Sequence, residues 1–208
     1  MTQFARVLSY TINPLILPPA LFGVIAYWSG GTGVQVAVAM GLAVLFFCAI
    51  PLVSMIQAVR GVPDATIELR DRTQRTVPYL VAIGSYVVAL AVIARSSLPA
   101  RDFLLAVTAT FILNGVLMLV INLYWKISLH VSTLAGFFSI VWFFLRRVES
   151  GVRMGAAAPS ITLAAIAIVL TATMMWARVE TEAHTRAQVL GGAAFGFVAP
   201  YVVLLFLA

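Results

Sequence analysis

Long runs of apolar residues alternate with short polar connections along almost the whole chain. A helix needs about 20 apolar residues to cross a bilayer, and a backbone in hydrocarbon must satisfy its own hydrogen bonds. The pattern therefore predicts an all-α, polytopic transmembrane helical bundle with six or seven spans. The runs lie at about residues 12–28, 34–59, 78–94, 102–124, 131–145, 158–176 and 188–207.

Composition supports the same class of protein. Of the 208 residues, 62% are hydrophobic and 10% are charged, whereas soluble domains carry roughly 25% charged residues. We therefore expect a single integral membrane domain over residues 1–208, in the cell membrane of a bacterial or archaeal type of cell. The first run contains Pro14, Pro18 and Pro19, so we expect it to be kinked near its start.

The net charge of +6 points to membrane lipids and an anionic substrate as partners. The basic residues lie in short connections between apolar runs, where anionic headgroups and substrates are nearer than nucleic acid. The only cysteine, Cys48, lies inside a run, so no internal disulfide is expected. Counting every cation would place the side with more of them in the cytoplasm. Cations that bind substrate cannot be counted in this way, so the orientation stays open.

With seven crossings, the connections 60–77, 125–130 and 177–187 fall on one membrane face. This face would hold both histidines of the chain, His130 and His184. Adding or losing a span is expected to break this convergence.

Connection 177–187 carries the most informative pattern. Arg178 precedes His184 by six residues, and Gln188 follows His184 by four residues at the start of an apolar run. On a helix, His184 and Gln188 would share a face. The glutamine could then accept the Nδ1 hydrogen and leave Nε2 as the nucleophile. Glu180, four residues before His184, could supply a carboxylate in the same way.

Two further connections carry residues suited to phosphate chemistry. Ser128 and His130, two residues apart, could bind a phosphate oxygen and protonate a leaving group, with Lys126 nearby. The alternative is an interfacial histidine beside a snorkelling lysine. The longest connection carries three close-spaced arginines, whose forks match phosphate oxygens. They could equally be an ordinary basic connector. They are Arg70, Arg72 and Arg75.

The order of these motifs resembles the type 2 phosphatidic acid phosphatase superfamily of membrane lipid phosphatases. That family has the motifs K-x6-R-P, P-S-G-H and S-R-x5-H-x3-D. The third reads here Ala177-Arg178, then His184, then Gln188, and the second is reduced to Ser128-Leu129-His130. The first keeps Pro78, but Val77 replaces its arginine and Arg75 is the nearest substitute. The resemblance covers about residues 60–208, with the motifs within 60–190.

The resemblance implies hydrolysis of a lipid phosphate or diphosphate, of phosphatidate or polyprenyl type, through a phosphohistidine. His184 would be the nucleophile, His130 the proton donor, and Gln188 would stand where the family has its orienting aspartate. The phosphate would be bound by Arg178, Arg75, Arg72 or Arg70, Ser128 and Lys126. No metal or other cofactor is expected, because the arginines supply the positive charge.

Two other functions stay open. The degenerate motifs and Gln188 also fit a catalytically impaired relative that binds or moves an anionic lipid. An intramembrane prenyltransferase would need acidic residues to hold magnesium and diphosphate, and Asp64, Glu68 and Asp71 lie at roughly helical spacing. Such enzymes carry two acidic motifs, of which this chain offers one.

Overall fold

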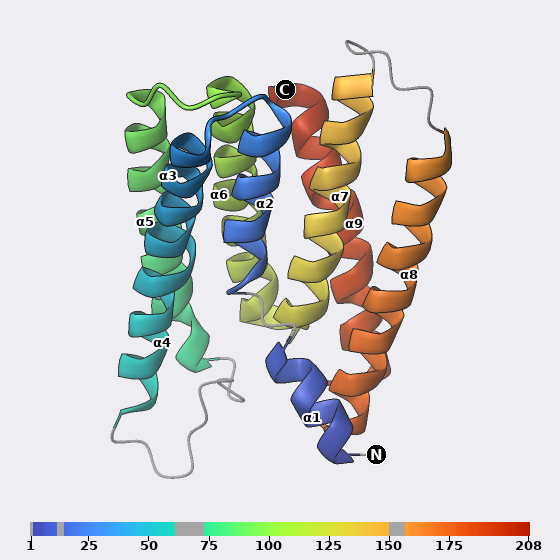
Figure 1. The fold of residues 1–208 in the computed structure, drawn as a ribbon. Helices are drawn as coiled ribbons and strands as arrows, with labels where there is room; N and C mark the ends of the chain where they lie inside the picture. The colour runs from blue at the N-terminus through green and yellow to red at the C-terminus, as the bar shows by residue number, and fades with distance from the viewer. Residues whose placement is uncertain (1, 12–14, 61–72, 150–156) are drawn as a thin grey trace. The chain divides into compact units, whose positions relative to one another are not determined.

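The computed structural model describes residues 2–11, 15–60, 73–149 and 157–208, and these residues form helices without any strand. The predicted all-α class is confirmed (Figure 1). The elements are α1 (Thr2–Thr11), α2 (Leu17–Trp28), α3 (Gly33–Ala43), a π-helical segment (Val44–Ala49), α4 (Ile50–Val59), a 3-10 turn (Thr73–Arg75), α5 (Thr76–Ala94), α6 (Arg101–Tyr124), α7 (Leu129–Glu149), α8 (Ala157–Glu180) and α9 (Arg186–Leu207).

Six helical stretches of the described chain are long and apolar enough to cross a membrane, in agreement with the predicted six or seven. Helix α3, the π-helical segment and α4 together make the first of them. The first apolar run instead gives α2, which has 12 residues and is therefore about 18 Å long, less than the hydrocarbon thickness. Pro18 and Pro19 lie in its first turn, where proline is tolerated. The expectation that losing any span would break the common face is wrong for this run: the connections 60–77, 125–130 and 177–187 all follow α2 in the chain, so their being on one face does not require α2 to span.

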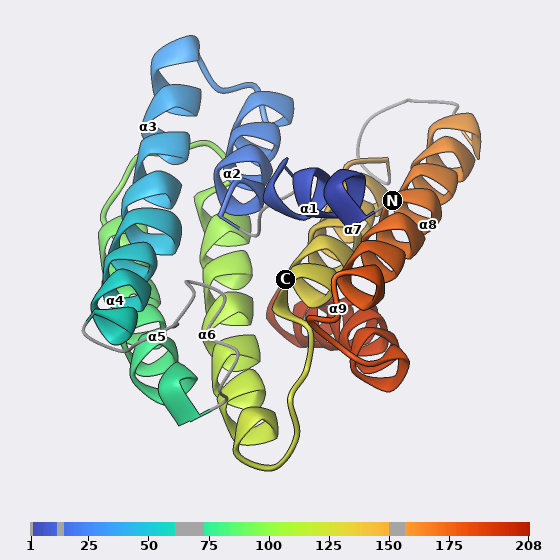
Figure 2. The ribbon, with the colours of Figure 1, turned by 90° about the horizontal axis from the view of Figure 1, so that it is seen from below.

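The chain divides into two compact units. One comprises Met1–Leu17 with Ile127–Leu207, and the other comprises Pro18–Lys126 with the terminal Ala208. In the first unit α7, α8 and α9 lie side by side, as both ribbon views show (Figure 2). Their shared core consists of apolar side chains at helical spacing on α7, with one or two from each partner helix: Val131, Leu134, Phe138, Ala167, Met174 and Val189.

Helix α7 is the central element of this unit. Of the residues in its apolar stretch, 61% are buried inside the protein, whereas the share is 22–33% in the other five candidate spans. Its contact with α9 is a backbone contact through glycines, as is usual where membrane helices approach closely. A Cβ at Gly192 would lie 2.9 Å from the carbonyl oxygen of Ser128, and one at Gly196 would overlap the carbonyl oxygen of Ser132. We call this close contact at Gly192 and Gly196 the seam between α7 and α9. It holds the start of α7 against the first turns of α9.

The second unit contains the π-helical segment Val44–Ala49, and the residues that follow the segment explain why it forms. The N–H of Ile50 donates to the carbonyl of Leu45, five residues earlier. Pro51 has no N–H for the carbonyl of Phe46, the next acceptor in that register. The hydroxyl of Ser85 on α5 lies 2.7 Å from this carbonyl oxygen and 2.8 Å from that of Ala82, so its one hydrogen serves both acceptors. One buried serine thus offers a donor to the backbone group that the π register and the proline leave open.

Candidate functional site

The turn after α8 brings Arg178 and His184 together through their backbones. Glu182 adopts a left-handed conformation with φ 54°, which reverses the chain after the helix ends. The N–H of His184 then donates to the carbonyl oxygen of Arg178 over 3.1 Å. Both side chains are buried, with 3% and 7% of their surface exposed. A cation and an imidazole are thus enclosed at the same end of α8.

Gln188 joins His184 to the start of α9. Its Oε1 lies 3.1 Å from His184 Nδ1 and also accepts the backbone N–H of Thr185 over 3.2 Å. The Gln188 N–H donates in return to Thr185 Oγ1 over 3.4 Å. Because Oε1 is an acceptor, the hydrogen of a neutral imidazole stands on Nδ1 and its lone pair stands on Nε2.

The reciprocal bonds between Thr185 and Gln188 form a capping box, which satisfies backbone donors at the start of α9. This corrects one prediction. His184 and Gln188 do not share a helix face, because α9 begins at Arg186 and His184 lies in the turn before it. Thr185 was not predicted as a site residue, although the sequence carries the signal of a capping box there: a threonine followed three residues later by a glutamine before an apolar run. Thr32 and Gln35 form a second such box ahead of α3.

Ser128, the residue before α7, belongs to the same cluster. Its N–H donates to the carbonyl oxygen of Gln188 over 3.4 Å, and it packs against Gly192. Its side chain is fully buried, and within the described residues its Oγ has no hydrogen-bond partner. Hydrogen bonds therefore connect Arg178, His184, Gln188 and Ser128 into one continuous cluster built from the end of α8, the start of α9 and the residue before α7.

The other predicted residues are placed less closely or not at all. His130 is partly exposed in the first turn of α7, within the same unit. Lys126 is partly exposed two residues before Ser128 and ends the second unit along the chain. Arg75, 9% exposed, closes the 3-10 turn ahead of α5 in that second unit. The remaining ones lie outside the described residues: Arg70, Arg72, Asp64, Glu68 and Asp71.

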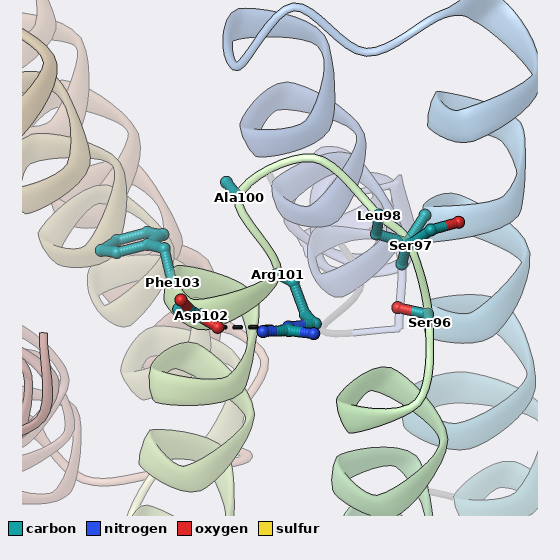
Figure 3. A pocket seen from close by; sticks show the side chains of 7 residues that line it. All are labelled: Ser96, Ser97, Leu98, Ala100, Arg101, Asp102 and Phe103. Atoms are coloured by element: carbon teal, nitrogen blue, oxygen red, sulfur yellow. Dashed lines mark hydrogen bonds and ion pairs between the residues drawn. The ribbon is translucent and has the colours of Figure 1, made fainter.

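A hollow of about 350 Å³ lies at the connection from α5 to α6, and Figure 3 shows the side chains that line it. The ion pair there joins Arg101 Nε to Asp102 Oδ1 over 3.2 Å, and both side chains face solvent. Ser96 and Ser97 line the same hollow. Neighbouring exposed charges of this kind contribute little binding energy, so the buried cluster around His184 is the stronger candidate site. No group of three or more histidine, cysteine, aspartate or glutamate side chains in the described part of the chain could hold a metal ion.

No family model, curated protein or solved structure matches this chain.

Proposed function

We propose that this protein is a membrane phosphatase that hydrolyses a lipid phosphate or diphosphate through a phosphohistidine at His184, without a metal ion. The observation that carries the proposal is the 3.1 Å contact between His184 Nδ1 and Gln188 Oε1, made by a buried imidazole beside the buried Arg178. A neutral histidine whose Nδ1 hydrogen is accepted by a side chain carries its lone pair on Nε2, the atom that we propose attacks phosphorus.

In the proposed reaction His184 Nε2 attacks phosphorus, and the bond from phosphorus to the leaving oxygen breaks. His130, as an imidazolium, protonates that oxygen. A water molecule then gives a proton to His130 and attacks the phosphohistidine, which releases phosphate and restores neutral His184. Gln188 accepts the Nδ1 hydrogen throughout and so supports the positive charge that the imidazole acquires.

The phosphate oxygens are bound by donors of the same cluster. The guanidinium of Arg178 supplies charge and a fork that matches two oxygens. The hydroxyl of Ser128, fully buried and without a hydrogen-bond partner in the part of the chain that is described, supplies a further donor. That Arg70, Arg72, Arg75 and Lys126 also bind phosphate stays a prediction from the sequence.

A second candidate is a relative that binds or moves an anionic lipid without hydrolysing it. The capping box favours it, because the helix start alone explains a glutamine at this position. Lipid binding that survives His184→Ala but not Arg178→Ala would support this function.

The test is phosphate release by the purified protein from phosphatidate and from a polyprenyl diphosphate in the presence of a chelator. We expect release by the wild-type protein and none by His184→Ala. Arg178→Ala should lose activity, whereas Arg186→Ala, which removes an exposed cation two residues after His184, should retain it. Absence of release by the wild-type protein from every lipid tested would refute the phosphatase. Release only with magnesium would point to the acidic residues of connection 60–77.

A further inference from the structure

Thr171, in the middle of α8, has an unusual hydroxyl. The residue is 4% exposed, and in the described structure its Oγ1 has no hydrogen-bond partner. Threonine in a helix commonly donates to the carbonyl four residues earlier. Thr173 on the same helix does so, with Oγ1 2.6 Å from the carbonyl oxygen of Val169, and Thr108 on α6 does so over 2.7 Å. Thr171 leaves this internal acceptor unused.

The neighbours of Thr171 on its own face of α8 are apolar. Ala167, one turn before it, and Met174, one turn after it, both belong to the core cluster shared with α7, and Thr171 lies on their face of α8. An unpaired buried hydroxyl is unfavourable, and a buried water would need two to four polar partners of its own. The hydroxyl is thus suited to an acceptor that a ligand brings.

Thr171 stands on the same face of the helix as the proposed phosphate site. It precedes Arg178 by seven residues, which is about two turns or roughly 10.5 Å deeper into the span. A long side chain on a helix leans toward the helix N-terminus, so the guanidinium of Arg178 leans in the direction of Thr171. This face offers a cation at the membrane boundary and a hydrogen-bond donor inside the apolar region.

We propose that Thr171 is a specificity-determining residue whose hydroxyl donates to an ester carbonyl of the lipid substrate. The inference rests on the proposed function. In an acylglycerol phosphate, ester carbonyls follow the phosphate by a few bonds and lie just below the headgroup. A polyprenyl chain has no oxygen beyond its phosphate. The site therefore favours acylglycerol phosphates.

The experiment compares three lipids: a diacyl phosphatidate, its dialkyl ether analogue without ester carbonyls, and a polyprenyl phosphate. Binding to the purified protein is measured by native mass spectrometry, and phosphate release is measured in parallel. Wild-type protein should prefer the ester lipid to the ether by roughly 3- to 10-fold, as one hydrogen bond allows. Thr171→Val should abolish the preference, and Thr171→Ser should keep it. Thr173→Val, the matched change on the same helix, should also keep it.

Equal binding of ester and ether lipids by the wild-type protein, or a preference that survives Thr171→Val, would overturn the inference. Unfolding of Thr171→Val would do so too, since it would show that the hydroxyl has a structural partner inside the protein. An ester preference without phosphate release would support the inference and refute the phosphatase. Phosphate release without a preference for the ester lipid would support the phosphatase and refute the role of Thr171.

Discussion

Replacing Gln188 by alanine should reduce phosphate release far more than it reduces stability, and Gln35 provides the matched control. Each glutamine is partly exposed and closes a capping box at the start of a span. Gln188 Oε1 accepts the Thr185 N–H over 3.2 Å, and Gln35 Oε1 accepts the Thr32 N–H over 3.0 Å. Loss of a cap costs about 0.5–2 kcal/mol. Gln35 Nε2 also donates to the carbonyl oxygen of Ser97 over 3.3 Å, so Gln35→Ala should be destabilised at least as much as Gln188→Ala.

Only Gln188 also holds a histidine. Its removal breaks the 3.1 Å contact with His184 Nδ1, and one neutral hydrogen bond contributes about 0.5–1.5 kcal/mol. That energy corresponds to a factor of roughly 2 to 13 in rate. Loss of the correct tautomer of His184 lowers the rate further. In the serine-protease triad, replacing the orienting aspartate by asparagine lowers turnover about 10⁴-fold for this reason. We expect Gln188→Ala to lose at least about tenfold in phosphate release, and Gln35→Ala to lose none beyond its unfolded fraction.

The assay is release of inorganic phosphate in detergent micelles, normalised to the folded fraction from a thermal unfolding curve of each variant. Equal specific activity of Gln188→Ala and Gln35→Ala would show that the contact with His184 plays no part in the reaction. The glutamine would then act as a helix cap alone.

Three further outcomes are expected. Gly196→Ala should lower the thermal unfolding midpoint, because its Cβ overlaps the backbone of α7 and overpacking costs about 1–3 kcal/mol; Gly41→Ala, with open space around its Cβ, should not. Ser85→Ala should destabilise the protein by about 1–3 kcal/mol in chemical unfolding, because the buried carbonyl of Phe46 loses its donor. Glu180→Gln should leave phosphate release unchanged, because Gln188 already accepts from His184 Nδ1, and a large loss would show that the carboxylate takes part.

The positions of most spans could be predicted from the sequence because bilayer thickness fixes the length of an apolar helix. The predicted runs 78–94 and 102–124 agree closely with α5 and α6. The run 131–145 was too short as a helix, since α7 extends to Glu149 through basic residues that hydropathy excludes. The π-helical segment could not be predicted from periodicity, because its open carbonyl is satisfied by Ser85, a residue far away in the sequence.

In the candidate site, too, the sequence predicted local features but not those that depend on tertiary contacts. Spacing alone identified the partnership of His184 with Gln188, and the structure confirms their contact. The geometry differs from the prediction, because the left-handed Glu182 and the capping Thr185 place the histidine before α9. The burial of Ser128 next to Gly192 depends on the seam between α7 and α9, a tertiary contact that a single connection does not reveal.

The requirements of the turn before α9 explain why position 188 carries a side chain longer than the aspartate of the resembled motif. One oxygen of Gln188 accepts both the Thr185 N–H and His184 Nδ1, and a capping box uses glutamate or glutamine at this position. Glutamate keeps that reach and adds the charge that stabilises an imidazolium, because hydrogen bonds to charged groups contribute about 1.5–3 kcal/mol. Gln188→Glu should therefore raise phosphate release about fivefold, for a gain of about 1 kcal/mol, at unchanged stability. Gln188→Asp, whose side chain is one carbon shorter, should lower the unfolding midpoint despite restoring the motif. Equal unfolding midpoints for the two variants would show that the charge, and not the cap, governs this position.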